Sequence, residues 1–260
     1  MAASIVAPLL VGAFVGPAAG YIGSIMVSRR MSLVGDALSH VALPGLALGI
    51  LFNFNPFVGA FAFLSAVMFA TWYLQKSTIL PVDAIIGVLF VLALAVGILI
   101  TPETELLEAL FGDIANVTEM DAAITSVLAI LAVVITWLIY KKMMLSMISR
   151  DIAVSLGVKV DLLNLVYLLL VALIVSIGIK EVGTLLVGAV VIVPAAAANV
   201  VSNSLRQYAV LSSVFGGMSA VSGITASYYL SFPSGPLVVV SGVIVFIASF
   251  ITYSIRKRSA

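Results

Sequence analysis

The sequence predicts an all-α fold, a polytopic transmembrane bundle of about nine helices, and two observations lead to this prediction. Of the 260 residues, 63% are hydrophobic and 9% are charged, and the mean hydropathy is +1.30. Soluble domains carry about 25% charged residues, so this chain has too much apolar surface for one water-soluble core. The apolar residues also form long continuous runs without the alternation of barrel strands, which indicates helices. We therefore expect residues 1–260 to form a single transmembrane domain.

A transmembrane helix needs about 20 mostly apolar residues. Polar and turn-forming clusters divide the chain into nine such segments, roughly 4–27, 31–52, 56–75, 81–101, 120–140, 160–179, 182–201, 207–230 and 236–255. With the N-terminus outside and the C-terminus in the cytoplasm, eleven of the 12 Lys and Arg residues lie inside. Because cytoplasmic loops of membrane proteins are rich in these residues, we expect a multi-pass cell-membrane protein in this orientation.

Two loops are more than simple turns. The outer loop, 101–121, contains Glu103, Glu105 and Asp113 among apolar residues, and we expect it to lie on the membrane surface or to cap the outer mouth of a cavity. The inner loop, 143–161, is amphipathic, and its "DIAVSLG" core predicts a short helix along the membrane. Such a helix either docks a cytosolic partner or only holds two spans in register.

Glycine and proline mark places where helices pack closely or bend. Gly12, Gly16 and Gly20 recur every four residues, a spacing that lets the backbones of two membrane helices approach each other. Pro44 removes one hydrogen bond within the second span and Gly45 follows it, so we expect a kink there.

The segment "GDALSHVALPG" places Asp36 and His40, the single histidine of the chain, inside the second span. On a helix, residues four apart share one face at about 6 Å. An ionised Asp in a membrane is costly and normally faces a polar interior. Three interpretations remain open: a structural pair at a helix contact, a short proton relay, or a divalent metal site. We favour the metal site, because carboxylate oxygen and imidazole nitrogen together suit Zn²⁺, Mn²⁺ or Fe²⁺.

Two ligands are too few for tight binding, so we expect a two-fold dimer to bring two Asp36 and two His40 side chains together.

Features that the sequence lacks restrict the possible functions further. The sequence has no cysteine, which excludes thiolate ligands, and its net charge of +1 gives no indication of a nucleic-acid partner. It also has no GxxxxGK[ST] motif. We therefore expect a transport subunit without enzymatic activity or a resident cofactor, whose ATPase, if any, is a separate chain.

The segment "GYIGSIMVSRRMSLVGDALSHVALPGLALG" closely resembles the signature segment of permeases from zinc, manganese and iron(II) ABC importers, the ZnuB- and MntB-like family. The likeness extends in the expected order through "LFGDIANVT", "ISRDIAVSLGV", "VGTLLVGAVVIVPAAAA" and "FPSGPLVVVSG", and so covers nearly the whole chain. Asp36 and His40 match the acid and the histidine of the family's GDxxxH motif.

The resemblance implies a homodimeric permease related to the vitamin B12 and siderophore importers. Its implied partners are two cytosolic ATP-binding subunits and an extracytoplasmic metal-binding protein. Asp151, Ala153 and Gly157, within a coupling segment of about 143–159, match the part expected to engage the ATPase. Asp113 would lie at the outer mouth, near the docked binding protein.

The transported ion is Zn²⁺ or Mn²⁺, with Fe²⁺ as a third candidate, and the motifs favour zinc slightly. The alternative function is a proton-coupled secondary carrier of metal ions. A carrier of that class would be expected to have more intramembrane acids and visible inverted repeats than this sequence shows.

Overall fold

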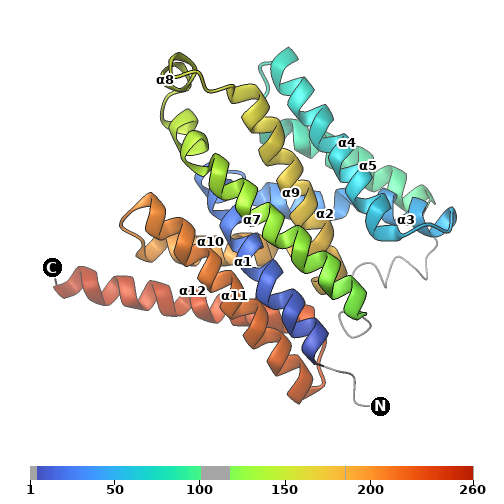
Figure 1. Ribbon diagram of the computed structural model, residues 1–260, viewed down its shortest axis with the longest axis vertical. Coiled ribbons are helices and arrows are strands. Elements are labelled where there is room, and N and C mark those ends of the chain that lie inside the picture. Colours follow the sequence, from blue (N-terminus) through green and yellow to red (C-terminus); the bar gives the residue numbers. More distant parts are fainter. Residues whose placement is uncertain (1–4, 101–117, 185, 260) are drawn as a thin grey trace.

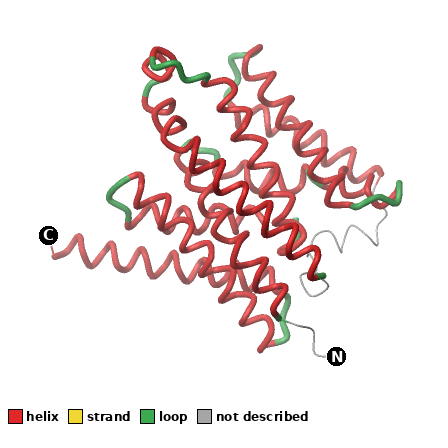
Figure 2. Tube along the Cα trace, in the orientation of Figure 1, coloured by secondary structure: helices red, strands yellow, loops and turns green. Residues whose placement is uncertain are grey.

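The computed structural model describes residues 5–100, 118–184 and 186–259, and every regular element in these ranges is an α-helix (Figure 1). The helices are α1 (Val6–Ser28), α2 (Ser32–Val41), α3 (Leu43–Leu51), α4 (Pro56–Ser77), α5 (Val82–Ile100), α7 (Glu119–Ile148), α8 (Arg150–Ser155), α9 (Val160–Val182), α10 (Val187–Val201), α11 (Leu205–Leu230) and α12 (Ser234–Ser259). Short turns join most neighbouring helices (Figure 2). The predicted all-helical fold is confirmed.

Eight segments of the described chain are long and apolar enough to cross a membrane, with α2 and α3 counted together as one. The remaining predicted span, 182–201, corresponds to α10 (Val187–Val201), which is shorter. Its 15 residues extend about 22 Å, less than the roughly 30 Å of a bilayer's hydrocarbon core. The expected span began at residue 182, but α9 continues to Val182 and the chain then turns at Gly183, whose φ is +83°.

Helix α10 lies in the interior of the bundle, in contact with α1, α2, α11 and α12. Ala195, Ala197 and Ala198 are fully buried, and the helix continues through Pro194. A helix whose sides are enclosed by other helices need not match the membrane thickness.

The predicted close packing of the first span is confirmed where α1 crosses α11. Gly12, Gly16 and Gly20 of α1 face α11, and a Cβ at Gly16 would lie 2.6 Å from the Gly216 carbonyl oxygen. A Cβ at Gly20 would meet the Ser212 carbonyl oxygen in the same way. Backbone therefore touches backbone along this contact, which is the most extensive between any two helices in the described chain.

The second span is broken at Ala42, which separates α2 from α3. Pro44 has no N–H to donate to the His40 carbonyl, so the helical ladder is interrupted one turn before the proline. Gly45 has a second role that its sequence position did not reveal. A Cβ there would collide with the backbone of Gly59, so this glycine also lets α3 and α4 cross closely.

The predicted short helix of the inner loop is present as α8. The loop itself begins later than expected, because α7 continues to Ile148 while Met143 and Met144 remain buried. Ser149 then adopts an extended conformation, and its hydroxyl accepts a hydrogen bond from the Ile152 N–H at 3.3 Å. This N-cap ends α7 and starts α8.

Long-range contacts place several helix ends at one end of the bundle. The Tyr140 hydroxyl of α7 donates to the Leu205 carbonyl of α11 at 3.1 Å, and Lys76 at the end of α4 lies 3.9 Å from Asp161 at the start of α9. Because successive spans cross the membrane in opposite directions, the C-terminal parts of α4 and α7 are expected at the same end of the bundle as the starts of α9 and α11. Helix α12 diverges from this end, crossing α11 and carrying the C-terminus away from the other helices (Figure 1).

Candidate metal site

Helix α2 presents Asp36 and His40 on one face, together with Leu33. Asp36 is exposed and Leu33 is 86% exposed in the single protomer. His40 is half-buried, and its ring centroid lies 6.0 Å from that of Phe90 in α5. The opposite face of α2 is packed inside the protein, with Leu38 and Val41 fully buried. The amphipathic sequence of α2 thus places both predicted ligands on one face, where Asp36 is exposed and His40 is partly covered by Phe90 of α5.

The first turn of α10 fixes the position of this face. Gly188 is the second residue of α10, and a Cβ there would lie 2.8 Å from both the Cα and the backbone nitrogen of Asp36. Only a glycine permits such an approach. The contact between α2 and α10 therefore fixes the position of the Asp36 backbone.

The two predicted ligands have no competing polar partners in the described part of the chain. The hydrogen bond at this position joins the Ser39 hydroxyl to the Asp36 backbone carbonyl, at 2.6 Å, and leaves the carboxylate unused. No group of three or more His, Asp or Glu side chains that could hold an ion occurs among the described residues. One protomer therefore offers one carboxylate and one imidazole, which is an incomplete coordination set for a divalent metal.

The residues predicted to engage an ATPase have different surroundings. Asp151 is exposed on the first turn of α8, whereas Ala153 is fully buried and seats the helix on the protein. Gly157 ends the turn after α8 with a φ of +77°, a left-handed conformation that favours glycine. The apolar side chains that α8 and its C-cap expose are Ile152 (52%), Val154 (55%) and Leu156 (67%).

The predicted outer-mouth acids Glu103, Glu105 and Asp113 lie outside the described residues.

A polar cluster at the Lys- and Arg-rich end of the bundle was missed by the sequence analysis. The Arg29 guanidinium donates to Asn164 Oδ1, and Asn164 Nδ2 donates to Gln75 Oε1 at 2.7 Å. Burial lowers the pKa of Arg29, and the nearby Tyr167 hydroxyl acts in the opposite direction. The sequence feature that could have indicated this cluster is Asn164, a polar residue inside a predicted span. Its presence does not show which residues of other helices it contacts.

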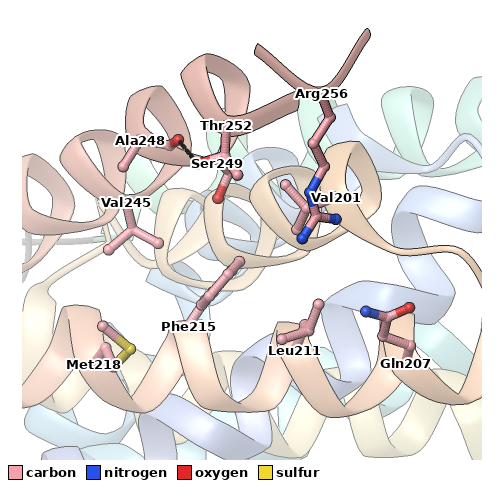
Figure 3. A pocket seen from close by; sticks show the side chains of 10 residues that line it. All are labelled: Val201, Gln207, Leu211, Phe215, Met218, Val245, Ala248, Ser249, Thr252 and Arg256. Carbon is pink, nitrogen blue, oxygen red and sulfur yellow. Dashed lines mark hydrogen bonds between the residues drawn. The ribbon is translucent and has the colours of Figure 1, made fainter. Parts of the chain in front are cut away.

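A cavity of about 400 Å³ lies between α10, α11 and α12 (Figure 3). Its lining is mainly apolar, with Gln207 and Arg256 at one end. Neither Asp36 nor His40 lines it. It therefore does not belong to the candidate metal site.

Known proteins are similar in sequence to this chain along nearly its full length. A manganese transport system membrane protein, MntC of Listeria monocytogenes, is 33% identical over 247 residues, covering 94% of this chain and 88% of the relative. A manganese import system permease protein, ScaB of Streptococcus gordonii, is 31% identical over 246 residues, covering 93% and 88%. A high-affinity zinc uptake system membrane protein, ZnuB of Buchnera aphidicola, is 30% identical over 247 residues, covering 92% and 94%.

Solved structures share the fold. The structure of PsaBC from Streptococcus pneumoniae in complex with Fab matches with a TM-score of 0.80 at 31% identity, covering 94% of this chain and 89% of that one. A metal-chelate type ABC transporter in an inward-facing conformation matches with a TM-score of 0.78 at 19% identity, covering 95% and 85%.

The family model described as the ABC 3 transport family matches residues 1–253. That range includes both candidate metal ligands, α8 and all but the last turns of α12. This chain therefore belongs to the ABC 3 transport family.

Proposed function

We propose that this chain is the permease subunit of an ATP-driven importer and that Asp36 and His40 bind its cargo, a divalent transition metal. The observation that carries the proposal is the pairing of one carboxylate and one imidazole on one face of α2, with Asp36 exposed. Relatives named for manganese and for zinc transport support this class of ion. As a permease subunit, the chain is not itself an enzyme.

The open face of α2 supports a homodimer. An exposed Asp36 beside an exposed Leu33 would place a carboxylate and a large apolar side chain side by side against lipid, and the charge alone would cost a few kcal/mol. A second copy related by a two-fold axis would cover both and would complete the site with another carboxylate and another imidazole. Four such ligands suffice for tetrahedral coordination.

Helix α8 is the proposed contact with a separate ATP-binding subunit. Its buried Ala153 anchors it to the bundle, while Ile152, Val154 and Leu156 leave an apolar surface available. We assign this end of the bundle to the cytoplasm because the basic residues gather there, which places the N-terminus outside. An extracytoplasmic metal-binding protein would deliver the ion at the opposite end.

The sequence motifs and the names of the relatives favour different ions within the class of divalent transition metals. The sequence motifs favour zinc slightly, whereas several of the relatives are named for manganese. A site of two carboxylates and two imidazoles accepts either ion. Both ions, and Fe²⁺, therefore belong in the test.

The test is metal uptake into vesicles that contain the permease, its ATP-binding subunit and the binding protein, with ATP hydrolysis recorded in the same vesicles. We expect Asp36→Ala and His40→Ala each to abolish most uptake while the complex still assembles and hydrolyses ATP. Ser39→Ala, on the buried side of the same helix turn, is the matched control and should retain uptake. Normal uptake by both site variants would show that the pair is structural.

The energy source of uptake distinguishes the ATP-driven importer from the alternative function, a proton-coupled secondary carrier. Uptake that continues without ATP, or without the ATP-binding subunit, and that follows an imposed proton gradient would favour that alternative. Uptake that requires hydrolysable ATP supports the importer.

A further inference from the structure

A polar cavity of about 510 Å³ lies among the ends of five helices, α1, α4, α7, α8 and α9. Arg29 follows the last residue of α1, Gln75 and Lys76 lie in the last turn of α4, Arg150 begins α8, and Asp161 lies in the first turn of α9. Because spans end where the hydrocarbon core meets water, this cavity lies at the depth of the lipid headgroups.

The charges lining the cavity do not balance. Arg150 donates to Asp161 at 2.9 Å, and Lys76 lies 3.9 Å from the same carboxylate. No other acid lines the cavity, so Asp161 is the acidic partner of both Lys76 and Arg150. Arg29 hydrogen-bonds the neutral amide of Asn164. Three cations therefore face one carboxylate, which leaves a surplus of two positive charges.

Hydrogen-bond donors are also in surplus. The Gln75 side chain accepts from Asn164 through Oε1, but its Nε2 is buried without any partner in the described structure. The Arg29 guanidinium, which lies 5.3 Å above the Tyr167 ring, keeps N–H groups beyond the one that binds Asn164. An unpaired buried donor is costly, and a ligand rich in acceptor oxygens would satisfy it.

We propose that this cavity binds the phosphate of an anionic phospholipid headgroup. A phosphate group supplies negative charge and several acceptor oxygens, which match both surpluses. Basic pockets between helices at the cytoplasmic face are suited to acidic lipid headgroups. The inference extends beyond the transport site and uses the proposed function only for the side of the membrane.

The aromatic residues beside the cavity favour a lipid over a soluble anion. Trp72 lines the cavity, donates its indole N–H to the Asp161 carbonyl at 2.7 Å and lies 3.7 Å beneath the Lys76 ammonium. Its neighbours on α4, Phe69 and Tyr73, are 53% and 60% exposed. Trp and Tyr concentrate at membrane interfaces, so this surface places acyl chains next to the cavity.

The experiment measures lipid binding to the full chain, purified in neutral detergent, by native mass spectrometry. Phosphatidylglycerol is titrated, with phosphatidylcholine and inorganic phosphate as comparison ligands. Lys76→Gln/Arg150→Gln removes two cavity cations that are 41% and 67% exposed, so the fold should tolerate it. Lys141→Gln/Lys142→Gln is the matched control, since it removes two exposed cations of α7 that do not line the cavity.

We expect the wild type to bind phosphatidylglycerol more tightly than phosphatidylcholine, the cavity variant to lose about tenfold in affinity, and the control to retain it. Gln75→Glu is a second variant, which keeps the acceptor for Asn164 but replaces the free donor with negative charge, and it should lose a similar factor. Elution volume and Tm without added lipid show that each variant is folded.

Equal loss in the control, or unchanged binding in both cavity variants, would overturn the proposal. So would inorganic phosphate that binds as tightly as the lipid, because the ligand would then be the free ion. An ATP-binding subunit that displaces the lipid and needs the same cations would assign the cavity to that partner instead. None of these readouts depends on transport, so they are independent of the test of the metal site.

Discussion

Gly188 lies against the backbone of Asp36, so that a Cβ on the glycine would be 2.8 Å from the Asp36 Cα and backbone nitrogen. The contact joins the start of α10 to the middle of α2. The position of the proposed metal ligand therefore depends on a residue with no side chain and more than 150 positions away in the sequence.

Gly188→Ala should lower metal uptake although it leaves both ligands in place. The added methyl group would force α2 and α10 apart, at a cost of about 1–3 kcal/mol typical of overpacking. Displaced carboxylates coordinate less well, so we expect weaker metal binding as well as slower uptake. Uptake in vesicles and the metal concentration that gives half-maximal rate measure both effects.

Gly87→Ala provides the control for this substitution. A Cβ at Gly87, in α5, meets nothing within 4 Å, so the extra methyl group is accommodated and uptake should match the wild type. If Gly188→Ala also transports normally, the α2–α10 contact does not position the site.

Gly216→Ala should destabilise the bundle without a specific effect on the ion. A Cβ at Gly216 would lie 2.9 Å from the Gly16 carbonyl carbon, in the backbone contact between α1 and α11. We expect a loss of about 1–3 kcal/mol, seen as a lower Tm of the purified protein. Protein that remains folded should keep the metal preference of the wild type. An unchanged Tm would show that α1 and α11 can separate at little cost.

The fold, and the placement of Asp36 and His40 on one helix face, were predictable from the sequence where the signal is local. Asp36 and His40 are four residues apart, so helical geometry alone places them on one face. Eight of the nine apolar segments likewise correspond to the described helical segments that are long enough to cross a membrane, because each is a continuous run. The short helix α8 was predicted from the amphipathic inner loop and its "DIAVSLG" core.

Features that depend on distant contacts were not predictable in the same way. The shortness of α10 follows from the turn at Gly183, which apolar composition conceals. The cavity cluster joins Gln75 to Asn164 across 89 positions and Arg29 to Asn164 across 135. The sequence pattern of a single helix cannot predict these contacts between helices, because they form only when the helix ends pack together.

Asp161→Asn should change the stability little, although it removes the partner of two cations. The side chains of Lys76, Arg150 and Asp161 are 41%, 67% and 51% exposed, and ion pairs exposed to this degree contribute about 0–1 kcal/mol. We expect a Tm within a few degrees of the wild type. A large loss of stability, persisting at high salt, would contradict the weak coupling expected for exposed charges.

Ile152→Asp should uncouple the permease from its ATP-binding subunit. Ile152 is 52% exposed on α8, and a carboxylate there would be buried at the proposed interface without a partner. We expect loss of copurification, and loss of the ATP hydrolysis that metal-loaded binding protein stimulates, in a permease that remains folded. Ser155→Asp is the matched control, because it adds the same charge to the same exposed helix but removes no apolar side chain. If both variants fail equally, charge on α8 rather than its apolar surface controls the contact; if neither fails, the ATP-binding subunit docks elsewhere on this end of the bundle.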